Sequence, residues 1–245
     1  MATGEAIQLE YKMKKGEEIR YKTTVDSEQT IKEGDQKQEM VSHLEMVMLQ
    51  KCSDVAADGT MTVDVVIESG TLKREGAEEP IPNVGQVISM KMKKNGEISQ
   101  TSVQMDFTQP AFPTKKIAKK EKWTADSKVN IPGRPEPIKL DYNYILWDFV
   151  KKEGHETVEI KVSCPDTKIE LQEGVEQVLS ATGTTYFAHK EGMLIMSEVE
   201  TKTDISAPKE NAAINTHIRV RVELVDAKKG SGVSAGAADD FQIAK

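Results

Sequence analysis

The chain has 245 residues, of which 38% are apolar and 30% are charged, and its formal net charge is −7. This composition indicates an ordinary globular protein with room for one large or two modest domains. The acidic balance argues against a general role in nucleic-acid binding, and no apolar run of about 18 residues predicts a transmembrane segment. The first residues, MATGEAIQLEYK, have no signal-peptide pattern, which fits a cytoplasmic protein or the mature part of an exported one.

Alternation of apolar and polar residues predicts antiparallel strands along the first half of the chain. A first strand carries residues 7, 9, 11 and 13 on one face, and residues 14–17 turn the chain into a second strand at 19–25. EGDQ at 33–36 interrupts that strand. AADGT at 56–60 and KKNGE at 93–97 predict hairpins, because Asp-Gly and Asn-Gly suit the positive φ angles of tight turns.

The second half repeats this order of strands and turns. KKEGHE at 151–156 predicts a hairpin, 183–205 predicts two strands joined by a turn, and 213–225 predicts a last strand. Residues 170–181 fit either a strand or a helix: Leu171, Val175 and Leu179 have helical spacing, whereas Gly174 and the β-branched residues favour a strand. We expect a strand there.

An internal duplication would explain why the two halves resemble each other. KMKKGEEIRYKTTV at 12–25 matches KIAKKEKWTADSKV at 116–129 with an offset of 104 residues, and two further pieces match in the same order. The predicted fold is mostly β and antiparallel, with little helix: two tandem β-sheet repeats that form a curved sheet, a half-barrel or a sandwich. We expect the repeats at 1–107 and 121–227, a linker at 108–120 and a flexible tail at 228–245.

No catalytic or metal-binding motif stands out. The sequence has no nucleophile elbow, phosphate-binding loop or zinc-ligand spacing, so we predict no catalytic residues, no metal site and no cofactor. Cys52 and Cys164 are either unpaired and buried, which we favour, or joined in a disulfide. The lysines between Lys115 and Lys122 suit a solvated linker or a phosphate-rich surface; the linker is favoured because Trp123 is their only aromatic companion.

Two segments are apolar on both faces of a predicted strand. In LDYNYILWDF at 140–149, residues 140, 142, 144 and 146 point one way and residues 145, 147 and 149 the other, and residues 44–49 show the same pattern. An antiparallel strand with one solvated face should alternate, so we expect both faces to be covered, by core packing, a partner chain or a bound molecule. The candidate lining of a ligand site is Met46, Met48, Tyr142, Tyr144 and Trp147.

The segments KKGEEIRY, DGTMTVDV and FAHKEGMLIMSEVET resemble those of a group of bacterial exported proteins of unknown function. The halves of those proteins begin with a Gly-Glu-containing strand that leads to a tyrosine and end with a glycine-centred hairpin. The resemblance implies a periplasmic or surface location after removal of a lipoprotein-type signal, and a curved antiparallel sheet like those of lipoprotein carriers. The chain departs from the pattern before Glu121, where Lys120 replaces the expected glycine, and no functional residue is carried over.

These observations lead to one predicted function and two alternatives. We expect an exported, non-enzymatic protein that binds a lipid or another apolar or amphipathic ligand on its curved sheet. The first alternative is a structural or protein-interaction scaffold at the cell envelope, and the second is an enzyme whose site assembles from dispersed residues. The ligand, the oligomeric state and the biological process stay open.

Overall fold

A computed structural model describes residues 6–101, 110–129 and 138–228. Their strands form one antiparallel sheet of 12 strands, and the one helix within these ranges is the short 3₁₀ helix η1 (Pro208–Glu210). The predicted mostly-β, antiparallel fold is confirmed. The predicted tail lies almost entirely outside the described residues.

The strands fall into two runs along the chain. The first run consists of β1 (Glu18–Glu33), β2 (Gln36–Val55), β3 (Met61–Arg74), β4 (Ala77–Pro80), β5 (Val87–Met92) and β6 (Ile98–Thr101). The second consists of β7 (Lys122–Val129), β8 (Ile138–Lys152), β9 (His155–Gln172), β10 (Val175–Ala188), β11 (Met193–Ala207) and β12 (Ala212–Lys228). Residues 170–181 therefore form a hairpin of two strands, as the β-branched residues indicated, with Gly174 at a φ of 78° in its turn.

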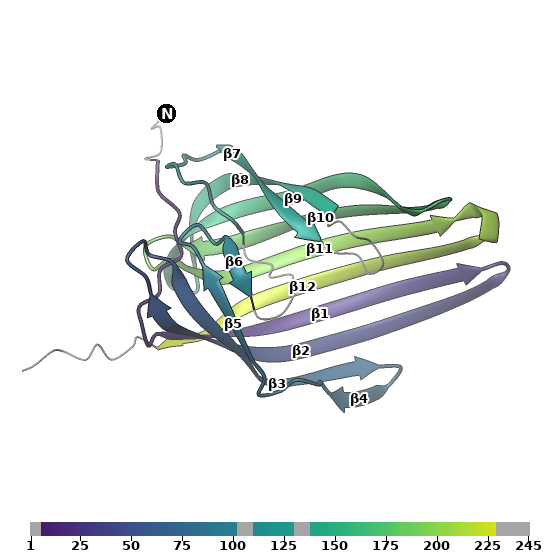
Figure 1. The fold of residues 1–245 in the computed structure, drawn as a ribbon, viewed down its shortest axis with the longest axis horizontal. Coiled ribbons are helices and arrows are strands. Elements are labelled where there is room, and N and C mark those ends of the chain that lie inside the picture. The colour runs from purple at the N-terminus through teal and green to yellow at the C-terminus, as the bar shows by residue number, and fades with distance from the viewer. Residues whose placement is uncertain (1–5, 102–109, 130–137, 229–245) are drawn as a thin grey trace, which may run out of the picture.

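The first and last long strands join the two runs into one continuous sheet. The strand order is β6-β5-β3-β2-β1-β12-β11-β10-β9-β8-β7, and β4 pairs with β3. β1 and β12 are paired along their whole length, from Glu18 beside Lys228 to Glu33 beside Ala212. Figure 1 shows these long central strands side by side. The two halves are therefore neighbours in one sheet and not the two layers of a sandwich.

The segment at residues 7–13, predicted as a strand, instead crosses one end of the sheet. Apart from a single bridge between Ile7 and Ile117, it has no ladder of strand pairs. The peptide nitrogen of Tyr11 donates to the carbonyl of Lys94 (2.7 Å), and that of Lys12 donates to the carbonyl of Gly192 (2.9 Å). We call this segment the strap, and the end of the sheet that it crosses the strap end (Figure 1).

The strap lies in the middle of the hydrophobic core. The ring of Tyr11 contacts those of Phe112 and Phe187, each with centroids 5.1 Å apart, and Phe112 and Phe187 are 4.7 Å apart. The Tyr11 hydroxyl donates to the carbonyl of Pro110 (3.1 Å). The same core contains apolar side chains of β3 and β5 on one flank and of β8 and β9 on the other. Because both flanks meet at the strap, the sheet curls around it.

A tight turn leads from the strap into β1. Gly16 has a φ of 84°, and its peptide nitrogen donates to the carbonyl of Cys52 (2.8 Å), whose own nitrogen donates to the carbonyl of Glu17 (2.9 Å). The carboxylate of Glu17 accepts from the peptide nitrogen of Lys14 (2.7 Å). The glycine supplies the left-handed conformation that the turn requires.

A turn of the same geometry leads into β7. The peptide nitrogen of Lys120 donates to the carbonyl of Leu146 (2.7 Å), whose nitrogen donates to the carbonyl of Glu121 (3.1 Å), and the Glu121 carboxylate accepts from the nitrogen of Ala118 (2.9 Å). Lys120 has a φ of 69°, where the first turn has glycine. The matched turns agree with the 104-residue offset, while the duplication itself stays a prediction.

The position of the strap generates a first prediction. Replacing Phe112, which is 3% exposed, with alanine should lower the free energy of unfolding by about 3–5 kcal/mol, because it leaves a cavity between the strap and β10. Urea denaturation followed by tryptophan fluorescence measures this. The control Val41→Ala, at a side chain on β2 that is 64% exposed, should change the stability by less than about 0.5 kcal/mol. Equal effects of the two variants would contradict the central role of the strap.

Candidate functional site

The inner face of the sheet, which we define as the face toward the strap, changes from closed to open along each central strand. On β1 the inner residues Ile19, Tyr21 and Thr23 are buried, whereas Val25, Ser27, Gln29 and Ile31 are half-buried. The same change occurs on β11 and β12, where Ser197 and Val222 are the last buried inner residues. The strap thus covers only one half of this face.

The open half of the inner face is formed by four adjacent strands, each with four half-buried side chains. These residues are Val25, Ser27, Gln29 and Ile31 on β1; Met40, Ser42, Leu44 and Met46 on β2; Val199, Thr201, Thr203 and Ile205 on β11; and Ile214, Thr216, Ile218 and Val220 on β12. None of them is charged. A half-exposed surface without charge on a protein with 30% charged residues is a candidate binding surface.

A row of hydroxyl groups marks the border between the closed and the open half. Thr23, Ser197 and Thr185 lie at the same level of β1, β11 and β10. The hydroxyls of Thr185 and Ser197 are hydrogen-bonded to each other at 2.9 Å. The Thr23 side chain is 4% exposed, and its hydroxyl has no hydrogen-bond partner among the described residues. A buried hydroxyl without a partner is costly, which makes Thr23 an unsatisfied polar group at the edge of the open half.

The outer face of the same strands is strongly charged. Lys22 on β1 pairs with Glu45 on β2 at 2.7 Å, and Arg219 on β12 pairs with Glu200 on β11 at 2.6 Å. The guanidinium of Arg219 lowers the pKa of the Glu200 carboxyl. Opposite-sign pairs across neighbouring strands stabilise a sheet and keep this face solvated. On the central strands, charged side chains therefore lie on the outer face, and the open half of the inner face is uncharged.

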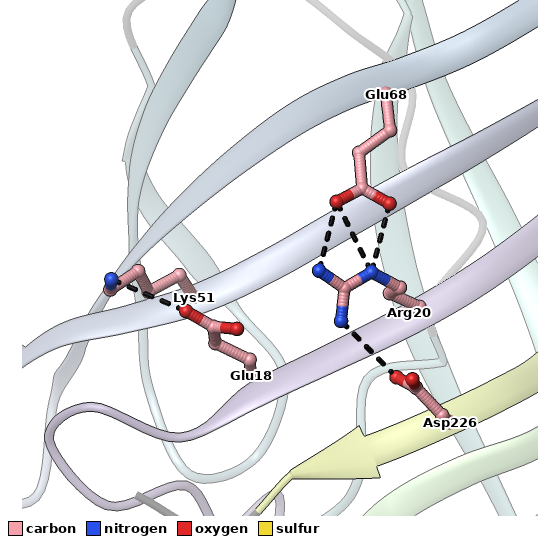
Figure 2. Close-up of polar contacts among 5 residues, drawn as sticks. All are labelled: Glu18, Arg20, Lys51, Glu68 and Asp226. Carbon is pink, nitrogen blue, oxygen red and sulfur yellow. Dashed lines mark hydrogen bonds and ion pairs between the residues drawn. The ribbon is translucent and has the colours of Figure 1, made fainter.

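Figure 2 shows the ion-pair cluster that ties the junction of the two halves together on the outer face. Arg20 on β1 binds both carboxylate oxygens of Glu68 on β3 (2.9 and 3.1 Å from Nε) and contacts Asp226 on β12 at 3.4 Å. Beside it, Lys51 pairs with Glu18 at 3.3 Å. The hydrogen bonds that Arg20 donates to Glu68 raise the pKa of Arg20. This cluster joins strands of both halves, and its carboxylates are engaged in ion pairs.

A polar hollow of about 420 Å³ on the outer face is a weaker candidate site. It lies over β10 and β11 and is lined by Thr182, Gly183, Thr184, Tyr186, Met196, Glu198 and Glu200. Glu200 is held by Arg219, and Glu198 lies 4.0 Å from Arg221. Both carboxylates that line the hollow are therefore close to arginine side chains.

The structure places four of the five predicted ligand-lining residues on the inner face. Met46 and Met48 lie on β2, and Tyr142 and Tyr144 lie on β8. Five strands separate the two pairs in the sheet, and Met48 and Tyr144 pack in the closed core. The residues between them on β1, β11 and β12, which complete the open surface, are absent from the predicted set. Their signal is present in the sequence as the alternation at 19–31 and 213–225.

Trp147 lies apart from the other four because of a β-bulge. Leu146 pairs with Ile160 and Asp148 with Glu159, which leaves Trp147 as the extra residue between them. Its side chain is 43% exposed, and the ammonium of Lys120 lies 3.0 Å from the ring centroid.

The bulge also overturns part of the expected strand pattern. Phe149 pairs with Val158 of the inner face, so it does not share a face with Ile145 as the alternation predicted. The expectation that both faces are covered is wrong for residues 140–149, because Trp147 is 43% exposed, whereas Val47 and Leu49 on β2 are half-buried. Among residues 6–101, 110–129 and 138–228, the single sheet has no second layer of strands or helices over its outer face.

Both cysteines are free and buried. Cys52 lies in the core at the strap end, and Cys164 lies on β9 in a smaller cluster with Leu140 and Ile169. Burial raises the pKa of both thiols. The favoured interpretation of two unpaired apolar side chains is therefore confirmed.

Comparisons with known proteins support the fold. No protein-family model matches the chain, and no curated protein matches it. Among solved structures, the chain is similar to one described as "Lipid-protein interactions in lipovitellin", with a TM-score of 0.55 and 9% identity over 93% of this chain. The match spans 27% of the lipovitellin chain, so this protein corresponds to about a quarter of that chain's length. At this identity the likeness shows the fold alone.

Two further solved structures have lower scores. One is a DUF1329 family protein from Desulfovibrio piger (TM-score 0.24), and the other is an outer membrane lipoprotein-sorting protein domain from Vibrio parahaemolyticus (TM-score 0.15). Both are 9% identical to this chain and cover 87% of it and 87% of their own chains, but these TM-scores support no structural argument. Within the described residues, no helix is long and apolar enough to span a bilayer.

The burial of the cysteines generates a second prediction. In the folded protein, neither Cys52 nor Cys164 should react with Ellman's reagent at pH 8, because the thiols are 0% and 2% exposed and their pKa values are raised. In concentrated guanidinium chloride without reductant, both should react at once. A stoichiometric reaction of either thiol in the folded protein, or no reaction after unfolding, would contradict the arrangement.

Proposed function

We propose that this protein is a non-enzymatic binder of an apolar or amphipathic molecule, such as a lipid, which lies on the open half of the inner face. The observation that carries the proposal is the absence of charge from the sixteen half-buried side chains of this surface, four on each of β1, β2, β11 and β12. A bound hydrocarbon chain would cover these side chains, and each buried methylene contributes about 0.8 kcal/mol.

The chemistry along the surface favours an amphipathic ligand. One row of side chains that crosses the four strands at the same height, which we call a level, is entirely apolar. It consists of Leu44, Val25, Val220 and Val199. The next level toward the strap contains the Thr23 hydroxyl, which has no hydrogen-bond partner among the described residues. A hydrocarbon chain along the apolar row, with its polar end toward the hydroxyl row at the border of the closed half, would fit both features.

The lipovitellin likeness supports the proposal as an analogy of fold. Lipovitellin is described by its interactions with lipid, and the similarity extends over 93% of this chain. We further propose that the protein is exported and acts at the cell envelope, as the resemblance of its strand and turn segments to bacterial exported proteins suggests. Fractionation of the native host, with an antibody against this protein, tests the location.

The third prediction tests the ligand surface with a matched pair of variants on β1. Val25→Glu places a carboxylate on the open half of the inner face, and should weaken binding of a fluorescent long-chain fatty acid at least about tenfold, because the charge must be desolvated under the ligand. Thr24→Glu, one residue earlier on the outer face and opposite Arg221, should leave binding unchanged. Fluorescence titration measures both.

Two outcomes would contradict the proposal. One is the absence of any bound lipid by native mass spectrometry of the protein purified from its own host, together with no binding of the fatty acid. The other is an equal loss of binding in both variants. If light scattering instead shows a dimer that Val25→Glu dissociates, the open surface is a contact between two copies, and the scaffold function takes the place of ligand binding.

A further inference from the structure

A basic corner of the sheet is not explained by the open half of the inner face. Residues 115–122 and 147–152 contain seven lysines and two carboxylates, a net charge of +5, whereas the chain as a whole carries −7. The hydrogen bonds of Lys120 and Glu121 with Leu146 place the two segments side by side at the strap end of β7 and β8. We call these two segments the basic corner.

Aromatic side chains are exposed within the basic corner. Trp147 is 43% exposed at its bulge, and Phe149 is 37% exposed two residues later. The ammonium of Lys120 lies over the Trp147 ring at 3.0 Å from the centroid. An exposed tryptophan surrounded by lysines is the combination that anchors proteins at the interfacial region of a bilayer.

Lys120 is held in a strained conformation. Its φ of 69° lies in the left-handed region, where the matching turn of the first half has Gly16 at 84°. Glycine adopts this conformation without strain and lysine does not. The turn therefore fixes the backbone of Lys120, and the side chain of Lys120 covers an exposed tryptophan.

We propose that the basic corner docks on the surface of an anionic lipid bilayer, with Trp147 entering the interfacial region. The positive charge of the corner attracts the anionic bilayer surface at long range, whereas the rest of the protein is acidic and does not. A nucleic acid fits less well, because Trp147 offers one ring and not a series on which successive bases stack. The proposal uses a different surface from the ligand-binding face and does not depend on it.

The test is co-sedimentation with vesicles of phosphatidylcholine alone and of phosphatidylcholine mixed with phosphatidylglycerol. The protein should bind the mixed vesicles only, and more weakly as salt is raised. The triple variant Lys116→Gln, Lys120→Gln, Lys151→Gln should lower the partition coefficient on the order of 100-fold. Each lysine near an anionic surface contributes a similar share of the binding free energy, and three are removed. A shift of tryptophan emission to the blue on binding should be lost in Trp147→Phe, which keeps the buried Trp123.

The first half of the chain offers a matched control. Lys14→Gln, Lys15→Gln and Lys51→Gln remove three exposed lysines around the equivalent turn, where no tryptophan lies, and should leave vesicle binding unchanged. Val25→Glu should also bind vesicles normally, which separates this proposal from the ligand-binding one. No binding, equal binding to neutral vesicles, binding retained by the basic-corner variant, or tighter binding to single-stranded DNA would overturn the proposal.

Discussion

The hydrogen bonds of two successive peptide groups in the strap determine the shape of the molecule. Tyr11 is bound to the β5–β6 turn and Lys12 to the β10–β11 turn, so two positions far apart in the sheet are held on one short segment. Twelve strands in one sheet would otherwise twist openly, with both faces solvated. Because the flanks are drawn together, the apolar residues of β3 and β5 share a core with those of β8 and β9, and the aromatic cluster around Tyr11 fills the space between them.

The two faces of the central strands differ in their charge. On the outer face, Arg20 connects β1 with β3 and β12, and further ion pairs join neighbouring strands, so ion pairs stabilise the junction of the two halves on this face. On the inner face, the sixteen half-buried side chains beyond the hydroxyl row at Thr23 are uncharged. A molecule that binds the central strands through apolar contact therefore has one face to use, whereas the basic corner serves a partner of opposite charge.

Much of this fold could be predicted from the alternation of apolar and polar residues in the sequence. The predictions that were wrong concern features that alternation does not report. Alternation in β1 and β12 correctly separates inner from outer residues. The strap also alternates, because every second side chain (Leu9, Tyr11 and Met13) is buried. It is nevertheless not a paired strand of the sheet. The bulge at Trp147 shifts the alternation of β8 by one residue, and nothing local in the sequence marks it. How far an inner face is covered depends on where distant segments cross it, so the open surface is visible only in three dimensions.

The length of the strands explains why half of the inner face stays open. β1 has 16 residues and is therefore roughly 50 Å long, while two paired segments that cross it cover a width of roughly 10 Å plus their side chains. The strap and its partner around Ile117 can bury the levels of Ile19, Tyr21 and Thr23, and none beyond. If the strands were shorter, the strap would close the core completely; if the open levels were charged, they would be ordinary solvated surface. Long strands with uncharged inner residues satisfy neither condition, so the described residues leave a half-buried, uncharged surface on the inner face of the central strands.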